Sequence, residues 1–148
     1  MKTILFSAIP IGLCFGLGLF TFYYGKGYSY FKNDPTACVN CHIMIEQYDG
    51  WQHSSHKAFA GCNDCHVPHA FPANFITKGL NGFNHSWAFT TGRFHEPIRI
   101  NKRNAQVLEE NCLYCHGELV GSVHPRGDRP EDSLSCVKCH KSVGHGGR

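Results

Sequence analysis

The chain has 148 residues, of which 42% are hydrophobic, with nine cysteines, eleven histidines and a formal net charge of +3. That charge alone would suit a nucleic-acid binder.

The first element expected is an apolar helix over residues 3–24, a stretch without a charged side chain. About 20 such residues are enough to cross the hydrocarbon core of a bilayer. A cleaved signal peptide is the alternative, but no Ala-x-Ala site follows and the apolar run is too long for a signal core. We therefore expect residues 1–26 to form an uncleaved single-pass anchor.

Two features within this helix admit a second explanation each. Cys14 is expected to be a small apolar packing residue and not a ligand. Gly12 and Gly16 form a Gly-x-x-x-Gly pair that would let a second helix approach closely, so we expect self-association within a complex. The ordinary enrichment of glycine in membrane helices explains the pair equally well.

Four Cys-x-x-Cys-His motifs follow, and each is the signature of c-type haem attachment. Their cysteines are Cys38, Cys41, Cys62, Cys65, Cys112, Cys115, Cys136 and Cys139, and their histidines are His42, His66, His116 and His140. Structural zinc and disulfides are the alternatives, but neither requires a histidine after each second cysteine. We therefore predict four covalently bound haem c groups. Their roughly eight ionised propionates would make the loaded protein acidic, so the formal charge of +3 does not indicate a nucleic-acid binder and we exclude that class. Bacteria attach haem c outside the cytoplasmic membrane, so residues 27–148 should form a periplasmic tetrahaem domain, with the N-terminus cytoplasmic.

The spacing of the motifs predicts the organisation of this domain. Nineteen residues separate His42 from Cys62, and nineteen separate His116 from Cys136. An equal spacing suggests an internal duplication, with pseudo-symmetric di-haem units over residues 38–66 and 112–140. Since about 120 residues must enclose four porphyrins, we predict a mainly α, haem-dominated fold of short helices and long loops, with little or no sheet.

The segment between the units is expected to carry a helix from Pro72 to Thr90. Its apolar residues recur at helical spacing in one stripe, made of Ile76, Leu80, Phe83 and Trp87. Lys78 and His85 lie on the opposite face. That face is either a plain solvated surface or a functional site.

Iron ligands are harder to assign, because four irons offer eight axial positions. Beyond the motifs there are seven histidines: His53, His56, His69, His85, His95, His124 and His145. Met44, two residues after His42, is the only methionine beyond the first residue. Residues two apart on a helix cannot face the same iron. Met44 therefore either replaces His42 as a ligand or merely packs against the porphyrin.

Four such motifs behind one N-terminal anchor resemble the NapC/NirT-type quinol dehydrogenases. Cys-x-x-Cys-His-x-Met at the first site is similar to the small subunit of the cytochrome c nitrite reductase complex. The resemblance spans essentially the whole chain and includes three further stretches: Trp51-x-x-Ser54-x-His56, Gly61-Cys62-Asn-Asp-Cys65-His66-x-Pro68-His69 and Val143-Gly144-His145.

The resemblance implies roles for individual residues. Met44 would ligate the first iron, with His42 as the ligand only if Met44 is not. His56 and His145 would be distal ligands of internal haems, which leaves His53, His69, His95 and His124 as bystanders. Lys78 would border a quinol pocket in the segment 67–95, and His85 stands where some relatives carry an acid. As a histidine, His85 could ligate the first iron. The second ligand of the His140 haem could come from the partner.

We therefore expect a menaquinol dehydrogenase of the bacterial inner membrane. It would pass electrons to a periplasmic cytochrome c nitrite reductase catalytic subunit, which reduces nitrite to ammonium in anaerobic respiration. Lys78 and His85 would take up the protons that the quinol releases. The alternatives are the same dehydrogenase serving nitrate, trimethylamine oxide or another acceptor, a plain electron carrier without a quinol site, and a haem enzyme acting directly on a small substrate.

Overall fold

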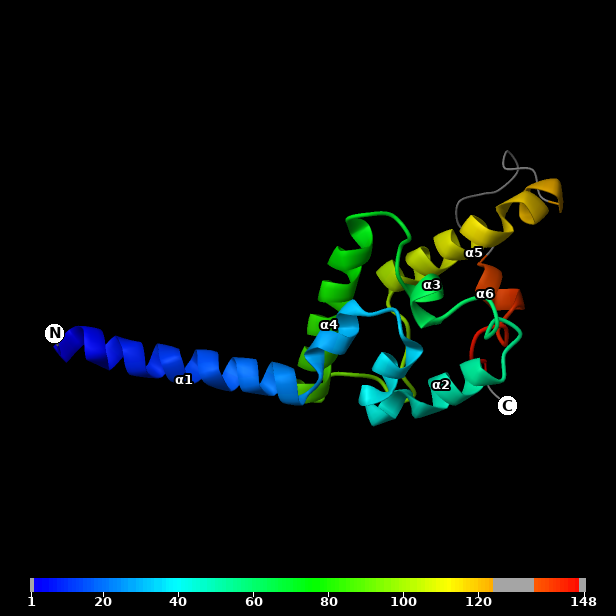
Figure 1. Ribbon diagram of the computed structural model, residues 1–148. Helices are drawn as coiled ribbons and strands as arrows, with labels where there is room; N and C mark the ends of the chain where they lie inside the picture. Colours follow the sequence, from blue (N-terminus) through cyan, green and yellow to red (C-terminus); the bar gives the residue numbers. More distant parts are fainter. Residues whose placement is uncertain (1, 124–134, 147–148) are drawn as a thin grey trace.

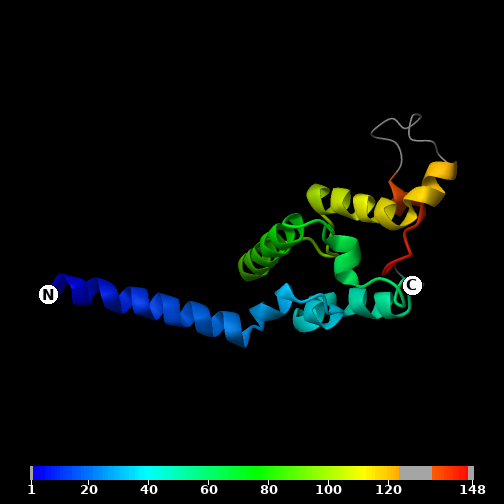
Figure 2. The same cartoon turned by 45° about the horizontal axis from the view of Figure 1, so that its top comes forward.

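A computed structural model describes residues 2–123 and 135–146 and begins with one long helix, α1 (Lys2–Tyr24). Its Phe6–Tyr24 part has a mean hydropathy of 1.7 and none of that stretch is buried. Figures 1 and 2 both show α1 projecting away from the rest of the chain. This helix is long and apolar enough to cross a membrane, and it matches the apolar helix expected over residues 3–24.

The chain leaves α1 through a tight turn at Lys26, whose φ of 52° lies in the left-handed region. Short helical pieces then follow one another as far as the second attachment motif. In chain order they are η1 (Gly27–Phe31), η2 (Pro35–Asn40), η3 (His42–Met44) and α2 (Ile45–Gln52). Asp34 begins η2 by accepting a hydrogen bond from the backbone N–H of Thr36 at 2.9 Å.

The remaining elements are also helices, and the described residues contain no strand. They are α3 (Cys62–His66), α4 (Ala73–Thr91), α5 (Lys102–Val123) and α6 (Cys136–Cys139). The prediction of a mainly α fold is therefore confirmed for the part of the chain that the structure describes. The helix predicted from Pro72 to Thr90 is α4, which ends at Gly92 in the left-handed conformation.

The two faces of α4 are reversed relative to an ordinary surface helix. The apolar stripe is open to the surroundings, with Ile76 57%, Phe83 66% and Trp87 57% exposed. Thr77, on the other side, is 8% exposed. In Figure 1, α4 runs across the direction of α1, beside the end of that helix. The part of α4 that carries Thr77 and Lys78 therefore packs against the protein, whereas His85, about two turns further along, is exposed. The choice between a solvated face and a functional one remains a prediction.

Helix α5 ties the other helices together through buried polar residues. The Asn104 amide donates to the Asn81 side-chain oxygen of α4 at 3.2 Å. The Asn111 amide donates to backbone carbonyls at the end of α3. Among the described residues only two hydrophobic side chains, those of Val67 and Val107, are buried. So small an apolar core fits a chain whose interior is completed by prosthetic groups.

The two predicted di-haem units have one arrangement in common. Helix η2, which holds Cys38, packs against α3, which holds Cys62. Helix α5, which holds Cys112, packs against α6, which holds Cys136. The internal duplication remains a prediction. The division into an anchor over 1–26 and a domain over 27–148 remains a prediction.

Candidate haem-ligation and quinol-contact sites

Two pairs of histidine rings face each other at a separation that suits haem iron. The ring centroids of His66 and His145 lie 5.9 Å apart, and those of His56 and His116 lie 6.0 Å apart. Two imidazoles that ligate one iron from opposite sides, each at about 2 Å, hold their centroids roughly 6 Å apart. Each pair joins one motif histidine to one of the two predicted distal ligands, so the residues fit a haem at both positions.

The backbone around these pairs holds the rings in place. His56 Nδ1 lies 3.0 Å from the Val143 carbonyl oxygen, which leaves its other ring nitrogen free to ligate a metal. Metal-ligating histidines ordinarily donate their second ring N–H in this way. Gly50 of α2 gives the C-terminal segment room, because a Cβ there would lie 3.1 Å from the His145 Cα. One short segment, 143–145, thus positions both distal histidines.

His66 is held neutral, which a metal-ligating imidazole must be. Burial, followed by the neighbouring His145 and His85, lowers the pKa of His66 to about 4. Burial also lowers the pKa of His85, although part of the His85 surface remains open. Because His85 contributes to the lowered pKa of His66, the His85 side chain of α4 lies near the second motif.

The first attachment motif is built differently from the others. His42 and Met44 lie on the short helix η3, and the edge of the His42 ring faces Phe89 of α4 with centroids 6.3 Å apart. The Tyr30 hydroxyl lies 3.8 Å from the Cys41 sulfur. Burial and the Cys41 thiol raise the pKa of Tyr30, so its phenol remains protonated. The choice between Met44 and His42 as iron ligand remains a prediction.

The inward face of α4 meets the segment that precedes this motif. Lys78 Nζ donates to the Asn33 side-chain oxygen at 2.6 Å and reaches the Phe31 and Lys32 carbonyls at 3.4 and 3.5 Å. One turn further along α4, a Cβ added at Gly82 would lie 3.8 Å from the Tyr30 ring. Lys78 and His85 thus share a face with Gly82, which contacts the tyrosine that touches Cys41.

The remaining histidines have other surroundings. His53 Nδ1 bonds to the Asp49 carbonyl oxygen at 2.8 Å, and His69 stacks on Tyr114 with centroids 4.2 Å apart. His95 is exposed, and His124 lies outside the described residues. None of these observations assigns a ligand role, so their status as bystanders remains a prediction. Within the described ranges no ring pairs with His140.

The structure does not favour the zinc alternative. Within residues 2–123 and 135–146, no three His, Cys, Asp or Glu side chains converge as they would around a metal ion. None of the nine cysteines forms a disulfide. Two free thiols in each motif, a histidine directly after the second, and neighbouring imidazole rings suit haem attachment and ligation.

Residues 1–147 match the family model of the NapC/NirT cytochrome c family, N-terminal region. The chain belongs to the NapC/NirT cytochrome c family. The family resemblance inferred from the motifs is therefore confirmed, and with it the class of c-type cytochromes.

Three known proteins are similar to this NapC/NirT-family cytochrome in sequence or fold. It is 38% identical to the cytochrome c-type protein NrfH of Wolinella succinogenes, over 98% of this chain and 88% of that protein. It is 24% identical to NapC of Haemophilus influenzae, over 76% of this chain and 68% of that protein. Its fold matches a chain in the crystal structure of the cytochrome c nitrite reductase NrfHA complex bound to the inhibitor HQNO. That match has a TM-score of 0.65 and 26% identity, and covers 97% of this chain and 90% of the other.

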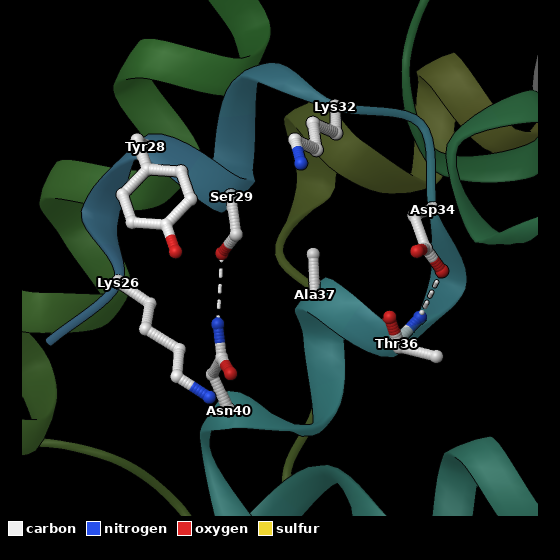
Figure 3. A pocket seen from close by; sticks show the side chains of 8 residues that line it. All are labelled: Lys26, Tyr28, Ser29, Lys32, Asp34, Thr36, Ala37 and Asn40. Atoms are coloured by element: carbon white, nitrogen blue, oxygen red, sulfur yellow. Dashed lines mark hydrogen bonds between the residues drawn. The ribbon is translucent and has the colours of Figure 1, made fainter.

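A polar pocket of about 160 Å³ lies between η1 and η2 of this family member, beside the end of α1 (Figure 3). Lys26, Lys32 and Asp34 contribute its charges, and the Asn40 amide closes it by donating to the Ser29 hydroxyl at 2.8 Å. Neither Lys78 nor His85 lines it. The pocket is therefore separate from the predicted quinol face of α4.

Sequence reasoning missed three residues that organise the sites. They are Tyr30 beside Cys41, Glu109 beside the fourth motif and Asn111 between the second and third motifs. Glu109 accepts hydrogen bonds from the Ser135 hydroxyl and, at 2.9 Å, from the Cys136 backbone N–H. Burial would raise the pKa of Glu109, but these hydrogen bonds outweigh it and lower the pKa. No local pattern marks such residues, because each acts on a segment distant in the sequence.

Proposed function

We propose that this cytochrome is a membrane-anchored quinol dehydrogenase with four haem c groups. It would supply electrons to the catalytic subunit of a periplasmic cytochrome c nitrite reductase. The similarity to NrfH over 98% of the chain supports this assignment. So does the match to a chain of the inhibitor-bound nitrite reductase complex NrfHA. Residues 1–26 would anchor the chain in the inner membrane, and residues 27–148 would lie in the periplasm.

The observation that carries the proposal is the inward polar face of α4. Lys78 is held there by three neutral oxygen atoms of residues 31–33. His85 lies on the same face, and Tyr30 connects the helix to the first attachment motif. A plain electron carrier needs no such group of proton-active side chains beside a haem. A quinol dehydrogenase does, because quinol oxidation releases two protons with its two electrons.

The chain's own residues would then bind the quinol and receive its protons. When bound, the haems supply one-electron redox chemistry. Lys78 would donate a hydrogen bond to a quinol oxygen, exchanging one of its carbonyl partners for the substrate. The lowered pKa of His85 leaves its imidazole neutral at pH 7, so it can accept one of the two protons that the quinol releases. Because the His85 side chain is exposed, it would release that proton to solvent and then accept the second.

The outward face of α4 would supply the route from the membrane. Its exposed apolar side chains lie beside the end of α1, the helix that would cross the bilayer. Aromatic side chains such as Phe83 and Trp87 are favoured at the membrane–water boundary. Menaquinol would thus reach the inward face of α4 without leaving the lipid.

We assign the iron ligands as follows. His66 would pair with His145, and His116 with His56, on the strength of the ring separations. Met44 would ligate at the first motif, with His42 in its place if Met44 is not the ligand, and His85 could ligate the same iron from its open side. His140 would take its second ligand from the partner subunit.

The test is reduction of the solubilised native complex by a menaquinol analogue, followed by addition of nitrite. Reduction and then rapid reoxidation are expected. Reduction without reoxidation would assign the dehydrogenase to a different reductase. Resistance to quinol combined with full reduction by dithionite would leave a plain electron carrier.

One second candidate has its own support, namely the same dehydrogenase serving another periplasmic reductase. The chain is 27% identical to TorC of Escherichia coli over 73% of its length, besides its similarity to NapC. The nitrite arm of the experiment separates the two candidates.

A further inference from the structure

Asn111 connects two haem-attachment motifs through a single buried side chain. It lies on α5 immediately before Cys112, the first cysteine of the third motif, and is 7% exposed. Its amide nitrogen donates to the carbonyl oxygens of Cys65 and Val67, each at 2.9 Å. Both acceptors flank His66, the histidine of the second motif.

The two carbonyls need this partner. Helix α3 ends at His66, so its last carbonyl groups have no acceptor role within the helix. Val67 is itself buried, at 7% exposed, so water has little access to this end of the helix. A buried carbonyl without a hydrogen-bond donor is unfavourable. If α3 shifted relative to α5, both hydrogen bonds from Asn111 would be lost together. The contact therefore fixes where the peptide of Cys65 and His66 lies relative to α5.

This point is also where the two di-haem units meet. Helix α3, which carries Cys65, packs against α5, which carries Cys112. Cys65 belongs to the first unit and Cys112 to the second. The hydrogen bonds of Asn111 thus link the backbone of the second motif, at Cys65, to the backbone of the third motif, which begins at Cys112.

We propose that Asn111 is the positioning residue that sets the geometry of electron passage between the two di-haem units. The proposal rests on the proposed function, in that electrons must cross from the first unit to the second. Asn111 touches no substrate. It acts through the peptides that carry Cys65, His66 and Cys112.

Asn104 provides a matched control on the same helix. It is buried to the same degree, at 8% exposed, and its amide also bonds across to another helix, at 3.2 Å from the Asn81 oxygen. That contact joins α5 to α4 and involves no attachment motif. Asn111→Leu and Asn104→Leu therefore remove similar buried hydrogen bonds, but only the first alters the junction between the units.

The experiment compares the holoproteins by EPR-monitored redox titration and thermal unfolding, then by rapid reduction with a menaquinol analogue. Asn111→Leu should change the EPR signals of the two bis-histidine sites and slow the spread of electrons into the second unit about tenfold, since small misplacements cost large factors in rate. Asn104→Leu should lower the melting temperature similarly and leave at parent values both the EPR signals and the rate at which the second unit is reduced relative to the first, because its partner Asn81 lies on α4 and a loss there would slow entry alone. If Asn104→Leu produces the same changes, or Asn111→Leu leaves the EPR signals unchanged, the proposal is overturned.

A variant that keeps part of the contact covers the case in which Asn111→Leu does not fold. Asn111→Ser retains one donor, so its EPR change should have the same direction and be smaller. Parent-like EPR signals in Asn111→Ser would overturn the proposal. The titration uses a chemical reductant, so it judges Asn111 even if quinol fails to reduce the protein.

Discussion

The two predicted di-haem units bring their motifs together on quite different backbones. In the first unit, residues 38–66, the 3₁₀ helix η2 with Cys38 packs against the five-residue helix α3 with Cys62. In the second unit, residues 112–140, the 22-residue helix α5 with Cys112 packs against the four-residue helix α6 with Cys136. The motif therefore fixes the covalent chemistry, while the neighbouring sequence decides the local conformation.

The neighbours of the two units differ more than their backbones. The first unit meets groups able to exchange protons, namely Tyr30 beside Cys41 and the Lys78–His85 face of α4. The second unit meets Glu109, whose carboxylate is occupied in holding Ser135 and Cys136. Under the proposed function, proton-coupled entry would therefore belong to the first unit, and the second unit would conduct electrons only.

The largest expected effect comes from removing the lysine of the first unit. Lys78→Leu should lower the rate of quinol-driven haem reduction by about 10²-fold, the scale of losing a positioned proton-transfer or hydrogen-bonding group. Reduction by dithionite should be unchanged. Lys138→Leu is the control, since Lys138 is an exposed lysine within the fourth motif. Stopped-flow absorbance of the haem bands measures both rates.

If Lys78→Leu and the parent reduce their haems with quinol at equal rates, Lys78 takes no part in quinol oxidation. The proposed difference between the two units then loses its main support. A loss of similar size in Lys138→Leu would show that any motif-associated lysine matters, and would place entry in neither unit.

The next effect concerns the ligand that the C-terminal segment brings to the first unit. Gly50→Val should displace the His145 backbone, because even the added Cβ would lie 3.1 Å from the His145 Cα and carbonyl oxygen. Overpacking of this kind costs about 1–3 kcal/mol. We expect the haem on His66 to lose part of its low-spin signal in EPR. Gly121→Val, at a glycine with open space around it, should keep the parent spectrum.

A smaller effect is expected in the second unit, where Glu109→Ala should reduce stability by about 1–3 kcal/mol through its lost hydrogen bonds. The folded-state pKa of Glu109 is lowered, so its contribution is present above the unfolded pKa and is lost as the pH falls through the folded value. The difference in unfolding free energy between parent and Glu109→Ala should therefore be constant near neutral pH and shrink below about pH 4.5. Quinol-driven reduction of the first unit should be unaffected. A pH-independent difference would mean that the carboxylate charge is irrelevant.

Sequence reasoning reached the elements that local patterns encode. The apolar run predicts α1, the stripe through Ile76 and Trp87 predicts α4, and the four motifs identify the family. It could not predict that α4 turns its apolar stripe outward, because periodicity fixes which residues share a face and not what that face meets. The facing pairs His66–His145 and His56–His116 were also beyond it. They depend on where the C-terminal segment returns, and that is set by contacts such as the His56 bond to the Val143 carbonyl.

The smallest effect is expected from a change on the outward face of α4, a helix that is not part of the second unit. Trp87 is 57% exposed on the apolar stripe, and Phe59, away from α4, is 90% exposed. If the stripe lies in the membrane boundary, Trp87→Gln should lower quinol oxidation in native membranes about fivefold, since it removes apolar area from the lipid contact. The same variant should retain its rate in detergent with a water-soluble quinol, and Phe59→Gln should behave as the parent in both media. Equal losses for Trp87→Gln in membranes and detergent would instead place the defect in the α4 fold. Entry from lipid would then have to be sought at another surface of the first unit.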